Sequence, residues 1–197
     1  MVATTKALII SKSEITTSLY YDPSGKNYND SEDVLDIGRN LMARILITGG
    51  SGFLGQHLAE SLKGENEIVI SSRNQKQLLG AAYKLNVQSI PLDVSNYAAT
   101  IEVFQRVKPE IVIHAAATKF VDLAEKYPNE CIDINILGSQ NVARAAMQMG
   151  TGYVLGVSTD KAAAPIANIY GMTKAIMEKL YTSLDGETET RFACVRY

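Results

Sequence analysis

Short apolar runs alternate with longer amphipathic stretches from Arg44 to the end of the chain. The short runs are continuous and rich in β-branched residues, which is typical of strands that are buried on both faces of a sheet. They predict six strands, at residues 44–48, 67–71, 89–94, 110–116, 152–158 and 191–197. Because strands and helices alternate, we expect right-handed crossovers and one doubly wound parallel sheet, an α/β fold.

The stretches between these strands predict amphipathic helices. The helix expected at residues 53–62 has a face made of Phe53, Leu54, Leu58, Ser61 and Leu62. Asn96 is placed to cap the helix that follows the third strand. A long helix is expected through residues 130–149, and the last one should begin near Ile169, after Pro165, and end near Leu184.

Residues 1–41 do not follow this pattern. The stretch "YYDPSGKNYNDSEDVLDIGRN" is polar, acidic and rich in turn residues, and "KALIIS" before it is the one candidate strand. We therefore place a domain boundary at Met42 and expect an N-terminal extension that is poorly ordered or arises from an upstream start site. A regulatory arm, or the remnant of another domain, is the alternative.

Composition narrows the functional classes. The chain has 197 residues, 46% of them hydrophobic, and a net charge of −2, so it offers no electrostatic basis for binding nucleic acid or an anionic membrane. No apolar run approaches the roughly 18 residues of a membrane span. The two cysteines, Cys131 and Cys194, lack metal-type spacing. We expect no metal site, two buried free thiols and a cytoplasmic location.

A glycine-rich stretch, "ILITGGSGFLG", joins the first strand to the first helix. Gly49 would permit the tight turn, Gly52 would let backbone approach a pyrophosphate, and Gly55 would let helix pack on strand. The helix N-terminus then offers free N–H groups to the phosphates. Strand, glycines and amphipathic helix in this order predict dinucleotide binding and a Rossmann sheet, with a merely structural turn as the alternative.

The end of the second strand indicates which dinucleotide binds. An NAD site usually has an acidic residue there, which would repel a 2′-phosphate, but this chain has Ser71, Ser72 and Arg73. A hydroxyl and a guanidinium hold a phosphate, so NADP is favoured over NAD unless Arg73 is merely a solvated loop residue. Asp93 and Val94, after the third strand, are placed to reach the adenine or else form a helix-capping turn.

Tyr170 and Lys174 lie at positions i and i+4 and therefore share one helix face. A free phenol, with a pKa of about 10, is a poor base at neutral pH. A nearby ammonium and a cationic nicotinamide ring would favour the phenolate and lower that pKa. The spacing alone is common by chance and would be surface decoration, but after a glycine loop and a fifth strand that ends in "STDK" this pair is a specific signal of a functional site.

Three stretches, "TGGSGFLG", "HAAATKFVDLAEKYPNECIDINILGSQNV" and "STDKAAAPIANIYGMTK", together resemble the extended short-chain dehydrogenase/reductase superfamily. Within it they are similar to the bacterial polysaccharide-biosynthesis branch of nucleotide-sugar 4,6-dehydratases and epimerases. The similarity covers roughly Ala43 to Tyr197. It implies an NADP-dependent enzyme that acts on a nucleotide sugar, with a UDP-sugar expected, and that forms homo-oligomers.

The resemblance also implies a role for each matched residue. Tyr170 would take the proton from the sugar 4-hydroxyl, while Lys174 would hold the nicotinamide ribose and lower the pKa of Tyr170. Thr159 would hydrogen-bond the reacting oxygen, and Asp160 with Lys161 would serve the elimination of the 6-hydroxyl as water. The cofactor would be lined by Gly49, Gly52, Phe53, Leu54, Gly55, Ser72, Arg73, Asp93, Val94, Ala115, Ala116 and Ala117, and by Tyr170 and Lys174.

Other matches are less specific. Lys119 is placed near substrate and Asn135 in the core helix. His114 ends the fourth strand, where it is either satisfied by backbone or functional, and His57 is expected to be structural. Asp160 and Lys161 could also form a plain surface ion pair.

Two departures from the relatives keep alternatives open. The spacing from Asp160 to Tyr170 is one position longer than in the related dehydratases, which shifts the balance toward an epimerase. The relatives continue well beyond the sixth strand, so a C-terminal substrate domain would be missing and full turnover is expected to fail. The alternatives are a simple short-chain dehydrogenase/reductase and a non-catalytic NADP-binding module.

Overall fold

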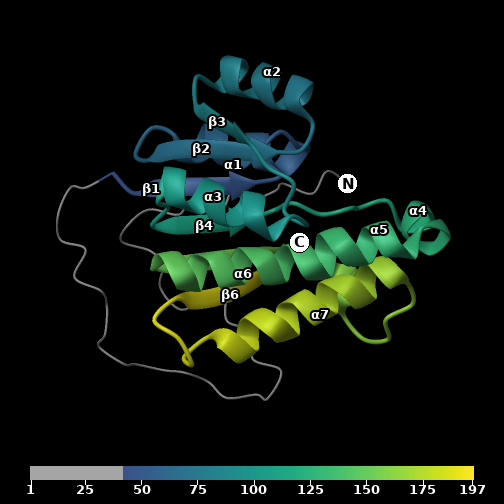
Figure 1. The fold of residues 1–197 in the computed structure, drawn as a ribbon. Helices are drawn as coiled ribbons and strands as arrows, with labels where there is room; N and C mark the ends of the chain where they lie inside the picture. Colours follow the sequence, from purple (N-terminus) through teal and green to yellow (C-terminus); the bar gives the residue numbers. More distant parts are fainter. Residues whose placement is uncertain (1–41) are drawn as a thin grey trace, which may run out of the picture. The chain divides into compact units, whose positions relative to one another are not determined.

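Six parallel strands form one sheet in the order β3-β2-β1-β4-β5-β6. The computed structural model describes residues 42–197 (Figure 1), so the expectations for residues 1–41 lie outside the described part. The strands are β1 (Arg44–Thr48), β2 (Glu67–Ser72), β3 (Gln88–Pro91), β4 (Ile111–His114), β5 (Tyr153–Ser158) and β6 (Arg191–Arg196). The predicted doubly wound parallel sheet is thereby confirmed.

Helices connect every pair of consecutive strands. They are α1 (Phe53–Leu62), α2 (Gln75–Leu85), α3 (Tyr97–Val107), α4 (Val121–Lys126), α5 (Pro128–Ile132), α6 (Gly138–Met149) and α7 (Ile169–Leu184), with a π turn at Asp133–Leu137 and a 3₁₀ turn at Asp160–Ala162. The π turn joins α5 to α6, and in Figure 1 the three run in one line with α7 alongside. The long helix expected at residues 130–149 is therefore present, but it contains a wider turn.

Asparagine side chains begin three of the helices. Asn74 accepts from the Gln77 N–H at the start of α2, and Asn96 accepts from the Ala99 N–H at the start of α3, as expected. Asn168 accepts from the Gly171 N–H at the start of α7. Each cap satisfies an N–H that has no partner within its helix, which fixes where that helix begins.

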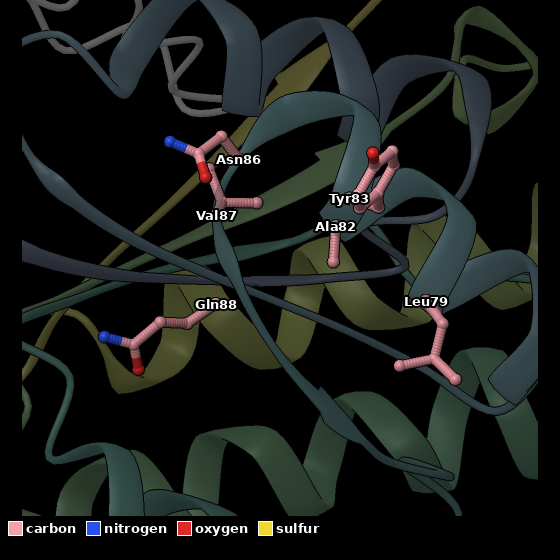
Figure 2. A pocket seen from close by; sticks show the side chains of 6 residues that line it. All are labelled: Leu79, Ala82, Tyr83, Asn86, Val87 and Gln88. Carbon is pink, nitrogen blue, oxygen red and sulfur yellow. The ribbon is translucent and has the colours of Figure 1, made fainter.

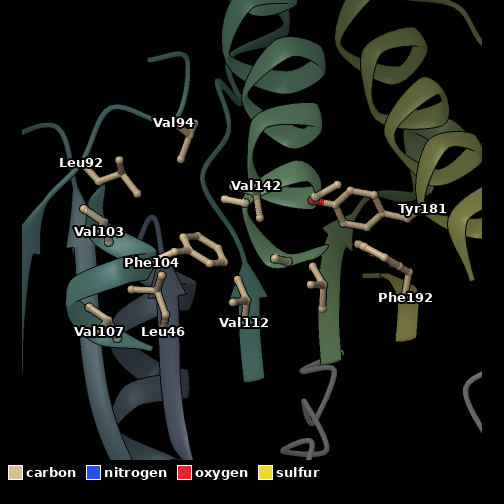
Figure 3. Close-up of a cluster of buried hydrophobic side chains, with 14 of the residues drawn as sticks. Leu46, Leu92, Val94, Val103, Phe104, Val107, Val112, Val142, Tyr181 and Phe192 are labelled. Carbon is tan, nitrogen blue, oxygen red and sulfur yellow. The ribbon is translucent and has the colours of Figure 1, made fainter. Parts of the chain in front are cut away.

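The main hydrophobic core lies between the sheet and helices α3, α6 and α7. Figure 3 shows Phe104 of α3 pointing toward Val142 of α6, over the strands that carry Leu46 and Val112. Because successive strand residues point to opposite faces, Ile45 and Ile47 are buried on the other face of β1. Both faces of the central strands are thus covered, as their continuous apolar sequence requires.

Three local expectations differ from the structure, the first being the fourth strand, which ends at His114 and not at residue 116. In α1 the buried residues are Gly55, Ala59 and Leu62, whereas Phe53 is 75% exposed. The helix lies close to the sheet through small side chains, so the bulky Phe53 falls outside the packed face. The third strand ends at Pro91 and not at residue 94, because the chain turns there toward the Asn96 cap.

No helix in residues 42–197 is long and apolar enough to cross a membrane. Among the same residues, no group of three or more His, Cys, Asp or Glu side chains could hold a metal ion. Cys131 is buried and Cys194 partly buried, and both are free thiols.

The core makes a direct prediction for stability. Phe104 is fully buried, so Phe104→Ala should lower the free energy of unfolding by about 3–5 kcal/mol through lost contacts and a cavity. Tyr83→Ala is the control, because Tyr83 is 91% exposed and its change should stay within about 0.5 kcal/mol. Urea denaturation at pH 7 measures both. Equal losses for the two variants would show that Phe104 does not anchor the core.

Candidate active site

The glycine loop lies against the backbone that follows β4. Gly49 has φ +70°, and a Cβ there would come within 2.7 Å of the Ala115 carbonyl oxygen and the Ala116 nitrogen. A Cβ on Gly55 would lie 2.5 Å from the Gly49 carbonyl oxygen. Larger residues at either position would therefore push the loop off the sheet. The tight turn predicted at Gly49 and the close packing predicted at Gly55 are both present.

The first turn of α1 leaves N–H groups available to a ligand. Gly52 is the N-cap residue, and no side chain caps this helix. Its own N–H donates to the Gly49 carbonyl at 2.9 Å, which holds the loop as a turn. An uncapped helix N-terminus behind a glycine turn is the arrangement that binds phosphate groups. Phe53 and Leu54 are the first residues of this helix. Phe53 is exposed and Leu54 is half-buried.

The end of β2 is tied to the same loop. The Gly50 N–H donates to the Ser71 carbonyl at 2.9 Å, and the Ser51 hydroxyl donates to the Ser72 hydroxyl at 2.8 Å. Ser71 Oγ is fully buried and has no hydrogen-bond partner within the described residues. Arg73 follows, with its guanidinium 3.0 Å from a carboxylate oxygen of Glu130 on α5. An uncapped helix end, a glycine cradle and an unpaired hydroxyl together fit a dinucleotide.

Asp93 and Val94 form a turn beyond β3. One Asp93 carboxylate oxygen accepts from the Ser95 N–H at 3.0 Å and from the Ser95 hydroxyl at 2.7 Å. Val94 is buried in the core, and its carbonyl accepts from the Asn141 amide at 2.9 Å. This geometry matches the helix-capping alternative, and an adenine contact by these residues stays a prediction.

His114 is satisfied by side chains, not by backbone. Its Nδ1 lies 2.8 Å from Thr48 Oγ1 and its Nε2 lies 3.0 Å from Ser139 Oγ. The Ser139 hydroxyl donates to the Asn135 carbonyl at 2.6 Å, so we assign the ring proton to Nε2, leaving Nδ1 to accept from Thr48. Burial, with the Lys174 ammonium adding to it, lowers the pKa of His114 to about 3. The ring is therefore neutral at pH 7.

Asn135 connects the π turn to the loop that carries Lys119. Its amide oxygen accepts from the Thr118 N–H at 2.9 Å, and its amide nitrogen donates to the Thr118 carbonyl at 3.3 Å and to Thr173 Oγ1 at 3.0 Å. Asn135, expected in the core helix, is fully buried in the π turn of that helix. The residues before Thr118, Ala115 to Ala117, are half-buried beside the glycine loop, whereas Lys119 is exposed.

Tyr170 and Lys174 both project from the first turns of α7. Tyr170 is half-buried, and burial raises the pKa of its phenol, with the Thr159 hydroxyl partly opposing the rise. Lys174 is 2% exposed, with Nζ 3.3 Å from Met177 Sδ, and burial lowers its pKa to about 8. The expected lowering of the Tyr170 pKa is therefore absent here, because the ammonium lies against Met177.

The 3₁₀ turn Asp160–Ala162 brings the second acid and amine to the same place. Gly171 of α7 packs on this turn, since a Cβ there would overlap the Lys161 carbonyl. Asp160 accepts from the Thr159 hydroxyl at 3.0 Å and from Lys161 Nζ at 3.3 Å, and these bonds lower its pKa. Both side chains are well exposed, so the pair has the geometry of the surface ion pair held as the alternative.

A clamp that sequence reasoning missed holds this turn. Arg196 at the end of β6 donates to both carboxylate oxygens of Glu178 on α7 and, at 3.4 Å, to the Ala162 carbonyl. Ser158, at the end of β5, donates to the same carboxylate. The sequence did indicate that Glu178 shares a helix face with Lys174, since it follows that residue by four positions. Nothing in the sequence indicates that Glu178 pairs with Arg196.

Figure 2 shows the side chains that line a hollow at the β3 edge of the sheet. It is lined by the last turns of α2 and the start of β3, namely Leu79, Ala82, Tyr83, Asn86, Val87 and Gln88. None of the predicted site residues lines it. With no charged side chain in its wall, this hollow has no evident chemistry, and the candidate site remains the end of the sheet described above.

Comparison with known proteins decides the family. The profile of the family described as "Polysaccharide biosynthesis protein" matches residues 45–197. The chain belongs to this family.

Individual relatives narrow the branch of the family. A UDP-N-acetylglucosamine 4,6-dehydratase (inverting) from Campylobacter jejuni is 37% identical over 161 residues, which cover 78% of this chain and 48% of the relative. A UDP-glucose 4-epimerase from Rickettsia bellii is 39% identical over 165 residues, with the same two shares. The chain thus spans about half the length of these curated relatives.

A solved structure shares the fold. The UDP-glucose 4-epimerase from Brucella ovis, solved in complex with NAD, superposes with a TM-score of 0.70 at 23% identity. The match covers 78% of this chain and 51% of that one. It supports the Rossmann-type sheet independently of the family match.

The buried Lys174 makes a prediction about stability and pH. Its pKa is lower in the folded chain than in the unfolded one, so the buried charge destabilises the fold below about pH 8, and this cost disappears as the pH rises toward the ordinary lysine value. Lys174→Met should raise the free energy of unfolding at pH 7 by about 2–3 kcal/mol.

The matched control is Lys179→Met, an exposed lysine on the same helix, which should change stability little. Urea denaturation at pH 7 and at pH 10 measures both variants. The advantage of Lys174→Met should shrink at the higher pH. An advantage that is absent at pH 7, or equal at both pH values, would contradict the assignment of a buried charged lysine.

Proposed function

We propose that this chain carries the nicotinamide-binding and catalytic half of an NADP-dependent nucleotide-sugar 4,6-dehydratase or epimerase of polysaccharide biosynthesis. The observation that carries the proposal is the proximity of Thr159 and Asp160, at the carboxyl end of β5, to Tyr170 at the start of α7, with Lys174 one turn further along that helix. The family membership and the relatives, which are named dehydratases and epimerases, support the same class.

The cofactor assignment rests on the glycine loop and the end of β2. The cradle formed by Gly49, Gly52 and Gly55 would take the pyrophosphate, and the uncapped start of α1 would meet its charge. Ser72 and Arg73 lie where the adenosine ribose would bind, and a hydroxyl with a guanidinium favours a 2′-phosphate there. A bound nicotinamide would accept the hydride that leaves C4 of the sugar.

In the proposed reaction the remaining steps belong to side chains. Tyr170 takes the proton of the sugar 4-hydroxyl, and the Thr159 hydroxyl, which interacts with that phenol, orients the oxygen. The Lys174 ammonium lies against Met177. If it bound a ribose hydroxyl of the cofactor instead, it would favour the phenolate form of Tyr170. The C5 proton, made acidic by the 4-keto group, and the 6-hydroxyl then leave as water, and the hydride would return to C6 while a proton returns to C5. The Asp160–Lys161 pair offers one basic site and one transferable proton, the balance that this elimination requires.

The pair also separates the two candidate activities. An epimerase returns the hydride to C4 and has no elimination to catalyse, so a functional Asp160 and Lys161 favour the dehydratase. The longer spacing from Asp160 to Tyr170 favours the epimerase. A UDP-sugar as substrate, homo-oligomerisation and a cytoplasmic location belong to the same proposal and stay predictions.

Calorimetric titration tests the cofactor assignment. NADP(H) should bind more tightly than NAD(H), and Arg73→Ala should weaken NADP(H) by roughly tenfold while NAD(H) changes little, because only the former has a 2′-phosphate. Equal affinities of the wild-type chain for the two cofactors would contradict the NADP assignment.

A single-turnover experiment tests the chemistry. The chain, saturated with NADP⁺ and mixed rapidly with a high concentration of UDP-N-acetylglucosamine, should show a transient rise in the near-ultraviolet absorbance of reduced nicotinamide, because the hydride that leaves C4 would return to the sugar within the same cycle. Tyr170→Phe should bind NADP⁺ unchanged but abolish the signal, since it keeps the ring and lacks the proton acceptor. Deuterium from D₂O at C5 would indicate the dehydratase. A wild-type chain that binds NADP⁺ and gives no signal, or a Tyr170→Phe variant as fast as wild type, would overturn the proposed roles.

A further inference from the structure

The ion pair between Arg73 and Glu130 joins two parts of the chain that are far apart in sequence. Arg73 follows the last residue of β2, and Glu130 lies in the first turn of α5. Arg73 Nη2 donates to Glu130 Oε1 at 3.0 Å, and the two side chains are 54% and 57% exposed. Neither side chain is needed to cover the core, so the pair is free to respond to a ligand.

The position of this pair is set by the glycine loop. Ser72 bonds to Ser51 of the loop, and the preceding residue, Ser71, accepts from the Gly50 N–H. These bonds place the first residue after β2 beside the turn that would hold the pyrophosphate. In doubly wound folds the group at this position contacts the 2′ position of the adenosine ribose. Arg73 is that residue here, and Glu130 already occupies one of its donors.

We propose that Glu130 is a specificity-determining residue that weakens the preference for NADP over NAD by competing with the 2′-phosphate for Arg73. The inference rests on the proposed function, since it requires a nicotinamide dinucleotide at this end of the sheet. It adds a residue that the glycine loop and the end of β2 do not include, from a helix more than fifty residues further along the chain.

Charge explains the direction of the effect. A 2′-phosphate must share or displace the Glu130 carboxylate, and it also meets that carboxylate as a like charge. NAD has a hydroxyl at this position, so it leaves the Arg73–Glu130 bond intact and gains no repulsion. Glu130 therefore lowers the affinity for NADP without changing the affinity for NAD. The pair is exposed, which limits the expected effect to roughly three- to tenfold in affinity.

Four chains test the inference by calorimetric titration with NADP⁺ and with NAD⁺ at low ionic strength. They are wild type, Glu130→Gln, Arg73→Ala and the double variant. Glu130→Gln should tighten NADP⁺ by roughly three- to tenfold and leave NAD⁺ unchanged. In the Arg73→Ala background the same substitution should have a smaller effect, because no guanidinium remains to be released. The gain should also shrink at high salt.

A matched control separates this effect from a general change of charge. Glu67 pairs with Arg44 at the opposite end of β1 and β2, with side chains 38% and 40% exposed, so Glu67→Gln removes the same charge from a similar ion pair. It should leave both affinities unchanged. Thermal melts should be alike for all variants, since Arg73 and Glu130 are both exposed.

The outcomes separate the two proposals. Wild-type binding of a dinucleotide with no change in the NADP⁺ to NAD⁺ ratio in Glu130→Gln would overturn the role of Glu130 and leave the proposed function standing. An equal gain for Glu130→Gln with and without Arg73 would show plain repulsion and overturn the competition for Arg73. Failure of the wild-type chain to bind either dinucleotide would overturn the proposed function and this inference with it.

Discussion

The approach of Gly49 to the peptide that joins Ala115 and Ala116 is the contact on which the site depends. β1 and β4 are neighbours in register, with Thr48 opposite His114, and the chain leaves both strands at the same level. A glycine with positive φ lets the two exits lie in contact. The Ala116 N–H donates to Thr48 Oγ1, which in turn donates to His114, so the separation of the strand ends is fixed by hydrogen bonds as well as by packing.

The same chain of bonds continues into the helical layer. His114 donates to Ser139 on α6, and Ser139 donates to the carbonyl of Asn135, whose amide holds Thr118 and Thr173. The glycine-loop side and the α7 side of the candidate site are therefore parts of one polar network within a hydrophobic core. A neutral histidine suits this network, because it donates at one nitrogen and accepts at the other, which an imidazolium could not do.

The apolar pattern predicted the strands because burial on both faces leaves a clear mark in the sequence. It failed at the end of β3, where Leu92 and Val94 are buried although the strand ends at Pro91 and Val94 lies in a turn, since hydrophobicity reports burial and not the extent of a strand. It failed in α1 because the buried face there includes Gly55 and Ala59. A hydrophobicity scale ranks both residues below Phe53, although their small size is what lets them pack closely.

The motifs predicted which residues gather at the end of the sheet, because each motif fixes a local turn or helix face. They could not predict partners that the fold brings together. Glu130 lies far from Arg73 in sequence, and the pairing of Arg196 with Glu178 depends on how α7 packs on β6. Nor could sequence tell that Lys174 would be buried with its ammonium against a thioether, because the same i, i+4 spacing occurs on exposed helices.

The π turn at Asp133–Leu137 makes the helix sensitive to length as well as to residue type. It accommodates one more residue than an α-helix would need over the same rise. Deleting a single residue from it would restore an ordinary helix over the same rise and leave the flanking helices in their present orientation. The residues inside the turn would shift, however, and Asn135 is one of them. Its amide could then no longer hold Thr118 and Thr173 together, so this turn must keep its residue count.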